Sequence, residues 1–127
     1  MRDVDLVSAW EEYPNYSINI ESIEYRLQLK FRDVIVADSE NVLKLNEPGI
    51  KSNYYFPRED INHDYFCLTN KVTFCPFKGL ASHWALSTED EGTKILAWSY
   101  DDPFKKLKII QNYVAFDLGE SVASVIH

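Results

Sequence analysis

Residues 25–32, YRLQLKFR, alternate strictly between apolar and polar side chains, and this period of two limits the possible folds more than any other pattern in the chain. The apolar members would face one side of a strand and the polar members the other: Tyr25, Leu27, Leu29 and Phe31 against Arg26, Gln28, Lys30 and Arg32. Such a strand is half-buried, with one face on a core. Arg32-Asp33 would then turn the chain into VIVADS, residues 34–39, so we expect a hairpin.

Further short apolar segments follow, separated by turn signals. Pro48-Gly49 closes one segment, Pro57 precedes what we expect to be a single helical turn, and the polar EDEG at 89–92 joins two strands. Asp101 or Asp102 before Pro103 is typical of a helix start. The expected strands are NVLKLNE, SNYYFP, DYFCLTNKVTFCPF (interrupted at Thr69-Asn70 and limited by Pro76), ASHWALST, TKILAWSY, YVAFDL and SVASVI. The sequence therefore predicts a mainly all-β fold of eight or more short strands, as a sandwich, a barrel or a tent-like pair of antiparallel sheets.

The chain has the length of one domain. Its 127 residues, of which 46% are hydrophobic and 14% aromatic, are enough for a core without disulfides or metals, and the aromatic content favours β structure. No linker, repeat or low-complexity segment divides it. We expect a single domain over 1–127, with residues 1–15 as an N-terminal extension that ends near Pro14.

Charge and cysteine content exclude several classes of protein. A net charge of −7 argues against a nucleic-acid partner, because such binding depends on Lys and Arg that neutralise phosphates. Cys67 and Cys75 form no C-x-x-C pair, so we expect no metal and no other cofactor. The start MRDVDLVSAW has no apolar signal core, and no apolar run could span a membrane. We therefore expect a cytoplasmic protein with no membrane partner, in which reduced Cys67 and Cys75 are the default and a disulfide between them is the alternative.

The sequence YYFPRED places a cation and two carboxylates after a proline. Arg58, held by Glu59 or Asp60, could present a planar pair of donors to a carboxylate or phosphate of a ligand. The alternative is a surface turn with a local ion pair, which contributes at most about 1 kcal/mol. Spacing alone favours the surface turn.

The segment TFCPFKG contains a cysteine, a lysine and a glycine. Cys75 would be a nucleophile only if a bend at Pro76 brought Lys78 to its side, since on a regular strand the two side chains point to opposite faces. We favour a packed thiol. Lys78 supplies a point charge for an anion, and Gly79 would let a ligand approach the backbone closely, although Lys-Gly is also a common turn.

Three further positions are candidates for a core or a pocket. His83 and Trp84 are consecutive and would face opposite sides of a strand, with Trp84 in the core and His83 solvated or hydrogen-bonded. Trp98 and Tyr100 share a face, where they would line a pocket or fill a core. Glu47 lies at a strand end, where pocket rims often lie.

Taken together, these segments resemble a known family. VADS (36–39), LNE (45–47), YYFPREDI (54–61), TFCPFKGLASHW (73–84), AWSYDDP (97–103) and YVAF (113–116) occur in the order and approximate spacing of the domain of unknown function 427 family, over about residues 17–118. Matching motif positions are Asp38, Ser39, Glu47, Tyr55, Arg58, Asp60, Thr73, Cys75, Lys78, Gly79, Trp98 and Tyr100. Asn112 replaces the glycine that the family usually has before YVAF, and Asn also tolerates a left-handed turn.

The resemblance implies a fold but no reaction. It implies a β-tent, in which two antiparallel sheets meet at an angle, without the two C-x-x-C zinc knuckles that many tent proteins carry. The family is also labelled nucleotidyltransferase-like. Such enzymes use a Gly-Ser followed by D-x-D, and DVD at 3–5 has no Gly-Ser before it.

Two hypotheses about function remain open. In the first, a small polar or anionic metabolite binds in a pocket that includes Tyr55, Arg58, Lys78, Gly79, Trp98 and Tyr100, with Glu47, Asp60 or, less favoured, Cys75 in a catalytic role if there is chemistry. In the second, the protein is an interaction or scaffold module. Its Arg58 would be bonded internally to Glu47 or Asp60, and Lys78 would cap a turn. Neither hypothesis identifies a protein partner.

Overall fold

The chain folds into two antiparallel sheets, as the alternating pattern predicted. The computed structural model describes residues 7–31, 33–88, 92–117 and 122–126. The larger sheet has seven strands in the order β1, β4, β5, β9, β8, β7, β6, and the smaller has the order β10, β2, β3. The strand bounds are β1 Asn19–Ser22, β2 Arg26–Phe31, β3 Val34–Ser39, β4 Leu43–Glu47, β5 Ile50–Pro57, β6 Phe66–Cys75, β7 Gly79–Thr88, β8 Gly92–Ser99, β9 Tyr113–Phe116 and β10 Val122–Ile126.

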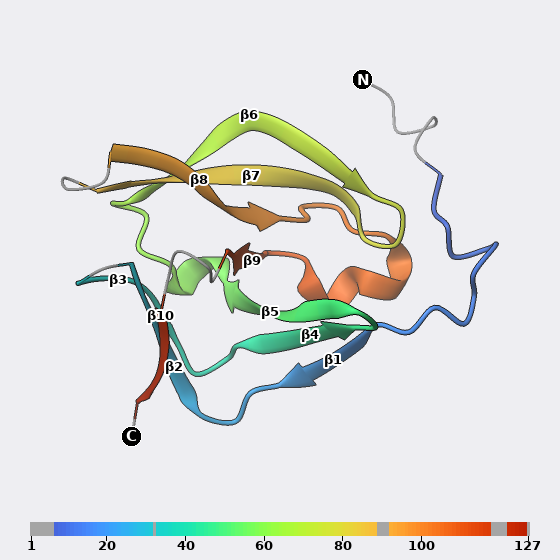
Figure 1. Ribbon diagram of the computed structural model, residues 1–127, viewed down its shortest axis with the longest axis horizontal. Coiled ribbons are helices and arrows are strands. Elements are labelled where there is room, and N and C mark those ends of the chain that lie inside the picture. The colour runs from blue at the N-terminus through green and yellow to red at the C-terminus, as the bar shows by residue number, and fades with distance from the viewer. Residues whose placement is uncertain (1–6, 32, 89–91, 118–121, 127) are drawn as a thin grey trace.

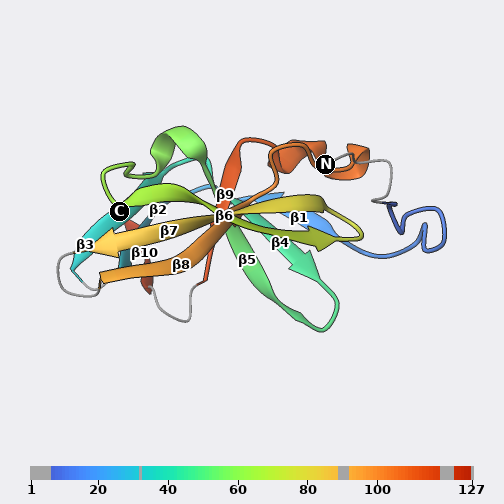
Figure 2. The same ribbon diagram turned by 90° about the horizontal axis from the view of Figure 1, so that it is seen from above.

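The larger sheet is strongly bent. In Figure 1, β6, β7 and β8 form its upper part and β4, β5 and β1 its lower part, with β9 between them. The strands of the smaller sheet run at a steep angle to these (Figure 1). Figure 2 shows the segment before β1 at one end of the molecule and β2, β3 and β10 at the other. This arrangement of two angled antiparallel sheets agrees with the expected tent.

The hairpin of β2 and β3 confirms the first sequence prediction. Leu27, Leu29 and Phe31 are buried, and Phe31 pairs with Val34, whereas Arg32 of the predicted turn lies outside the described residues. Tyr25 differs, because it lies just before the strand and is exposed.

Two tight turns take the conformation that their residues favour. Glu47 pairs with Ile50 around Pro48-Gly49, and Gly49 has a φ of 72°. Asn112, which leads into β9, has a φ of 68° and is the non-glycine residue with positive φ in the described chain. The left-handed conformation expected for this position is confirmed.

Helical structure among the described residues amounts to short 3₁₀ segments. Arg58–Asp60 forms η2, the single turn expected after Pro57. Lys105–Ile110 forms η3, but it starts later than predicted: Phe104 stands at the N-cap, and no side chain caps the helix. The predicted cap at Asp101 or Asp102 is wrong, since Asp101 accepts hydrogen bonds from Arg58 and Ser82, and Asp102 pairs with Lys108.

Strand β6 is continuous where an interruption was expected. A register shift between Leu68 and Val72 accommodates Thr69-Asn70 as a bulge, so the ladder to β7 resumes beyond it. The strand ends at Cys75, as expected from Pro76. Trp84 is buried, and the His83 ring is hydrogen-bonded to the Thr73 hydroxyl at 2.8 Å, which confirms both expectations for this pair.

The larger sheet carries a hydrophobic core on each face. Consecutive residues fall into different cores, as the pleat requires: Phe56 and Val114 pack against the smaller sheet, whereas Tyr55 and Ala115 pack against η3. We call these the small-sheet core and the η3 core. The η3 core consists of Leu43, Leu45, Tyr55, Ala81, Tyr100, Leu107, Ile110 and Ala115.

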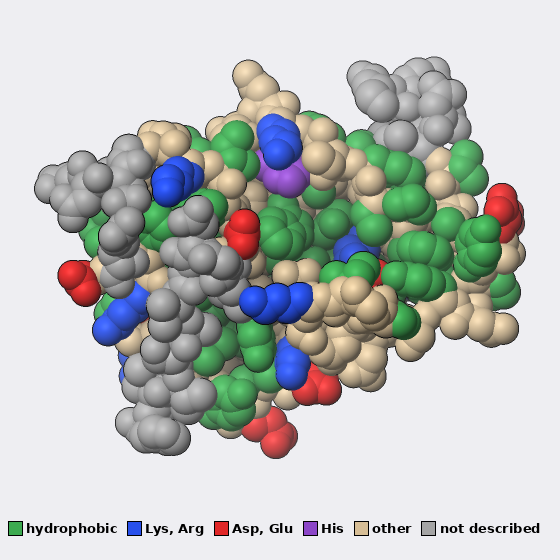
Figure 3. All heavy atoms as spheres, in the orientation of Figure 1, with side chains coloured by type: hydrophobic (Ala, Val, Ile, Leu, Met, Phe, Trp, Pro, Cys, Tyr) green, Lys and Arg blue, Asp and Glu red, His purple; other side chains and the backbone are tan. Residues whose placement is uncertain are grey.

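No helix in the described residues is long and apolar enough to cross a membrane. Charged side chains on the face shown in Figure 3 are scattered singly over the surface and do not gather in one basic patch.

Candidate functional site

The turn between β6 and β7 directs Lys78 into the molecule. The Lys78 amide donates to the Cys75 carbonyl at 3.2 Å, and Gly79 then takes a φ of 117° that side-chain-bearing residues rarely adopt. The turn is held from outside, because Phe104 N–H donates to the Lys78 carbonyl at 2.9 Å. The bend at Pro76 therefore does bring Lys78 to the side of Cys75.

Lys78 and Glu47 form an ion pair that is almost closed to solvent. Their side chains are 9% and 6% exposed. Glu47 ends β4 and shares the inward face with Leu43 and Leu45, so the strand period itself carries its carboxylate toward the η3 core. Lys78 Nζ donates to Glu47 Oε1 and lies 3.9 Å from Cys75 Sγ.

The other carboxylate oxygen of Glu47 accepts a hydrogen bond from Tyr16. Tyr16 Oη donates to Glu47 Oε2 at 2.6 Å, and this bond is the main cause that raises the pKa of Tyr16 to about 12. Glu47 thus accepts hydrogen bonds from Lys78, in the turn between β6 and β7, and from Tyr16, in the segment before β1.

Two tyrosines of the η3 core complete this group of polar side chains. The Tyr55 side chain is fully buried, and its hydroxyl has no partner in hydrogen-bond geometry within the described residues. Burial raises the pKa of Tyr55 well above its usual value, an effect that the Trp98 indole partly offsets and the charge of Glu47 reinforces. Burial likewise raises the pKa of Tyr100, as do the nearby Tyr55, Cys75 and Glu47.

We call Tyr16, Glu47, Tyr55, Cys75, Lys78 and Tyr100 the ion-pair cluster. Its chemistry is that of an ammonium and a carboxylate in a region of low dielectric constant, where each group interacts more strongly with a polar ligand than it would in water. The ammonium donates, the carboxylate accepts, and the Tyr55 hydroxyl has unused capacity for both.

Sequence reasoning missed the contribution of the first described residues. The Trp10 indole donates to the Phe77 carbonyl at 2.7 Å, and Ala9 N–H donates to the Pro76 carbonyl at 2.9 Å. Tyr16 stacks on the Phe77 ring, with centroids 3.9 Å apart and planes 10° apart. The aromatic side chains in SAWEEYPNY were the available signal, because aromatic residues in an exposed extension would have no reason to recur.

Arg58 lies on the opposite face of the larger sheet. Its guanidinium bonds to Asp101 and to Ser99 Oγ at 3.3 Å, and it lies over the Trp84 ring at 5.2 Å from the centroid. Ser99 follows Trp98 in β8, so the two side chains point to opposite faces. Arg58 Nε is buried without an acceptor.

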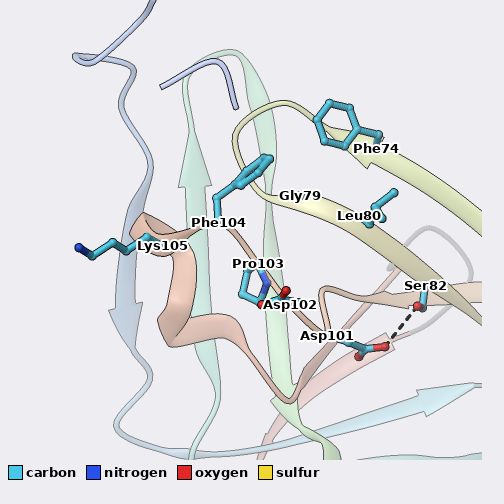
Figure 4. A pocket seen from close by; sticks show the side chains of 9 residues that line it. All are labelled: Phe74, Gly79, Leu80, Ser82, Asp101, Asp102, Pro103, Phe104 and Lys105. Carbon is cyan, nitrogen blue, oxygen red and sulfur yellow. Dashed lines mark hydrogen bonds between the residues drawn. The ribbon is translucent and has the colours of Figure 1, made fainter. Parts of the chain in front are cut away.

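A groove of about 460 Å³ adjoins the Arg58 network. Phe74, Gly79, Leu80, Ser82 and residues 101–105 line it (Figure 4). The rings of Phe74 and Phe104 meet edge to face at 6.0 Å, Asp101 points to Ser82, and Lys105 points away from the other lining side chains (Figure 4). The groove is thus mostly apolar, with carboxylates at one end.

Asp60 lies apart from both the ion-pair cluster and the Arg58 network. Its carboxylate accepts a hydrogen bond from the buried Ser39 hydroxyl at 2.6 Å, which ties η2 to the end of β3. The internal bond predicted between Arg58 and Glu47 or Asp60 is therefore wrong: Arg58 pairs with Asp101, and Glu47 pairs with Lys78.

The structure brings together most, but not all, of the sequence-predicted site residues. The ion-pair cluster and its immediate surroundings contain Glu47, Tyr55, Cys75, Lys78, Gly79, Trp98 and Tyr100. Arg58 and Asp60 lie elsewhere. Among the described residues, no three His, Cys, Asp or Glu side chains are grouped so that they could hold a metal ion, and both cysteines are free.

Comparison with models of known protein families gives a match over most of the chain. The model of a family described as a domain of unknown function, DUF427, matches residues 19–126. The chain therefore belongs to this family, as the motifs indicated. No curated protein matches the chain. Glu47, Lys78 and the other predicted site residues lie within the matched region, whereas Trp10 and Tyr16 precede it.

Proposed function

We propose that this member of the DUF427 family binds a small polar molecule at the Glu47–Lys78 pair. The observation that carries the proposal is the ion pair itself, with side chains less than a tenth exposed, beside a buried Tyr55 hydroxyl that has no partner. Removing two charges from water costs several kcal/mol per ion, and attraction within the pair often fails to offset it. An unsatisfied buried hydroxyl adds a further cost of about 1–3 kcal/mol.

The pairing refines the chemistry of the expected ligand. Lys78 already has a carboxylate partner, so a simple anion would have to compete with Glu47. A molecule that offers a donor to Glu47, in place of the Tyr16 hydroxyl, and an acceptor to Lys78 would engage both members of the pair without separating them. Tyr55, Trp98 and Tyr100 would surround such a molecule, and Glu47 remains the candidate for general acid–base chemistry if a reaction takes place.

Arg58 favours the alternative hypothesis of a structural network. Its guanidinium is engaged with Asp101, Ser99 and the Trp84 ring, and none of these belongs to the ion-pair cluster. We assign Arg58 a role in holding η2 and the end of β8 together. A cytoplasmic, reducing location is also part of the proposal, supported by the two unpaired cysteines.

Thermal unfolding in the presence of a panel of small hydroxylated, amide-bearing and carboxylate compounds tests the proposal. Wild type is compared with Glu47→Leu/Lys78→Met, which removes both charges together, and with Arg58→Ala as the matched control on the other face. We expect at least one compound to raise the Tm of wild type and Arg58→Ala alike, and to leave the double variant unchanged. Equal responses in all three proteins, or a response lost only in Arg58→Ala, would overturn the assignment to Glu47 and Lys78.

A further inference from the structure

The segment that precedes the family region lies directly over the ion-pair cluster. We call residues 8–18 the N-terminal strap. It is held to the β6–β7 turn by Ala9 and Trp10, and Lys106 of η3 lies 4.6 Å from the Trp10 ring centroid. Figure 1 shows the strap as the blue segment at the right of the molecule, on the side of η3.

Tyr16 is the strap residue that reaches the charged pair. Its ring stacks face to face on Phe77, and its hydroxyl donates to Glu47 Oε2 at 2.6 Å. These two contacts are those that a planar ring with a hydroxyl donor would make if it entered from solution: one apolar face on Phe77 and one hydrogen bond to a carboxylate.

The residues on the two sides of this contact differ in their position relative to the matched family region. Glu47 and Phe77 lie inside the matched family region, which starts at residue 19, and Tyr16 lies before it. The acceptor and the stacking surface are therefore part of the family domain, and the strap adds a group that occupies them.

We propose that Tyr16 stands in the place of a ligand, and that the ligand class of the Glu47–Lys78 site is a planar aromatic molecule with a hydroxyl group. The inference rests on the proposed function and deepens it by naming the part of the ligand that Glu47 and Phe77 recognise. Lys78 remains available to an acceptor elsewhere on the same molecule. The strap acts as an intramolecular competitor, at an effective concentration of about millimolar for a short tether.

Tyr16 has space to leave without disturbing a core. One side of it borders a hollow of about 250 Å³ that Trp10, Pro14, Ile18, Ile20, Lys106 and Leu107 also line. Tyr16 itself is only partly buried, and it is absent from the buried members of the η3 core. Replacement of its side chain should therefore open the position and leave the sheet intact.

Calorimetric titration of the full chain with 4-methylphenol tests the inference. The ligand has the ring and hydroxyl of the tyrosine side chain, and 4-methylanisole is the matched probe that lacks the donor. Tyr16→Ala opens the position, and Tyr13→Ala is the matched control, since Tyr13 touches Phe77 only at a ring edge, at 6.5 Å, and is exposed. We expect 4-methylphenol to bind Tyr16→Ala at least about tenfold more tightly than wild type or Tyr13→Ala.

The hydrogen bond to Glu47 gives two further expected results. A hydrogen bond to a charged group is stronger than one to a neutral group. We therefore expect 4-methylanisole to bind Tyr16→Ala about tenfold or more weakly than 4-methylphenol does, and 4-methylphenol to bind Tyr16→Ala/Glu47→Gln more weakly by a similar factor. Equal binding of both probes to Tyr16→Ala, or no binding of 4-methylphenol to that variant with its fold intact, would overturn the inference. If such a result is found but polar compounds still stabilise wild type through Glu47 and Lys78, the proposed function stands and only the assignment of an aromatic hydroxyl ligand fails. If polar compounds do not stabilise wild type either, the proposed function and the ligand assignment both fail.

Discussion

Glu47 receives hydrogen bonds from two donors that are far apart in the sequence, Lys78 and Tyr16. A carboxylate with both oxygens engaged and little contact with water depends on its partners, and each partner in turn depends on it. Tyr55 beside them is the opposite case: its hydroxyl is buried and has no partner in hydrogen-bond geometry, although the Trp98 indole is close enough to lower its pKa. At the scale of single residues, the Glu47 carboxylate would therefore be costly to leave unpaired, whereas removal of the Tyr55 hydroxyl should be favourable.

Tyr55→Phe should leave the free energy of unfolding unchanged or raise it by about 1 kcal/mol, because it removes a buried hydroxyl that has no partner. Urea denaturation at pH 7 measures the change. Tyr16→Phe is the matched control and should lower stability, since it breaks a hydrogen bond to a carboxylate. A clear loss of stability in Tyr55→Phe would show that the hydroxyl has a partner, such as the Trp98 indole.

Lys78→Met alone should lower the free energy of unfolding by about 3–5 kcal/mol, because it leaves Glu47 as a buried charge without its cation. Arg58→Ala breaks a more exposed pair, with side chains 33% and 48% exposed, and should cost less. Urea denaturation of the two variants compares them. An equal or smaller loss for Lys78→Met would contradict the burial of the pair.

At the scale of elements, the turns and strands follow local sequence closely. The period-two pattern of β2 and the turn at Pro48-Gly49 were predictable from neighbouring residues, and the left-handed Asn112 from the family resemblance, which usually has glycine at this position. The bulge in β6 and the late start of η3 were not. In both, tertiary contacts override the local signal: pairing to β7 continues past Thr69-Asn70, and Asp101 bonds to Arg58 and Ser82 instead of capping a helix.

Asn112→Ala should lower stability by about 1 kcal/mol, because alanine has no local compensation for a left-handed conformation. Asn112→Gly should be nearly neutral, since glycine adopts positive φ freely. The difference between the unfolding free energies of the two variants measures the cost of the left-handed backbone conformation at position 112. A loss in the glycine variant as large as in the alanine variant would mean that the Asn112 side chain itself contributes.

The β6–β7 hairpin should weaken in mild acid. Burial, together with the charge of Lys71, lowers the pKa of His83 below its ordinary value, so the unfolded chain takes up the proton more readily than the folded one. His83 therefore contributes no pH dependence above its unfolded pKa of about 6.5, and stability falls as the pH drops below that value toward the folded pKa. Urea denaturation at pH 7 and pH 5 should show a smaller decrease for His83→Gln than for wild type. An identical decrease in both proteins would refute a role for His83.

At the scale of the whole molecule, the candidate site depends on segments that only the fold brings together. The sequence allowed Lys78, Glu47, Tyr55 and Trp98 to be chosen as site residues, and all four lie around the η3 core. The pairing of Lys78 with Glu47 was not predictable, because 31 positions separate them and their contact requires the bend of the larger sheet. Arg58 lies on the other face, the face of Phe56, and its pairing with Asp101, 43 positions away, was not predictable from neighbouring residues.

The unfolding free energy of Glu47→Leu/Lys78→Met, measured by urea denaturation, tests most directly whether this pair is kept for binding or for folding. If the pair is a binding site, the double variant folds and is as stable as wild type within about 1 kcal/mol, or more stable, because apolar residues of similar volume avoid the desolvation of two charges. If the pair is a structural network, the double variant loses several kcal/mol or does not fold. That result would contradict the central claim and return the Glu47–Lys78 pair to the scaffold hypothesis.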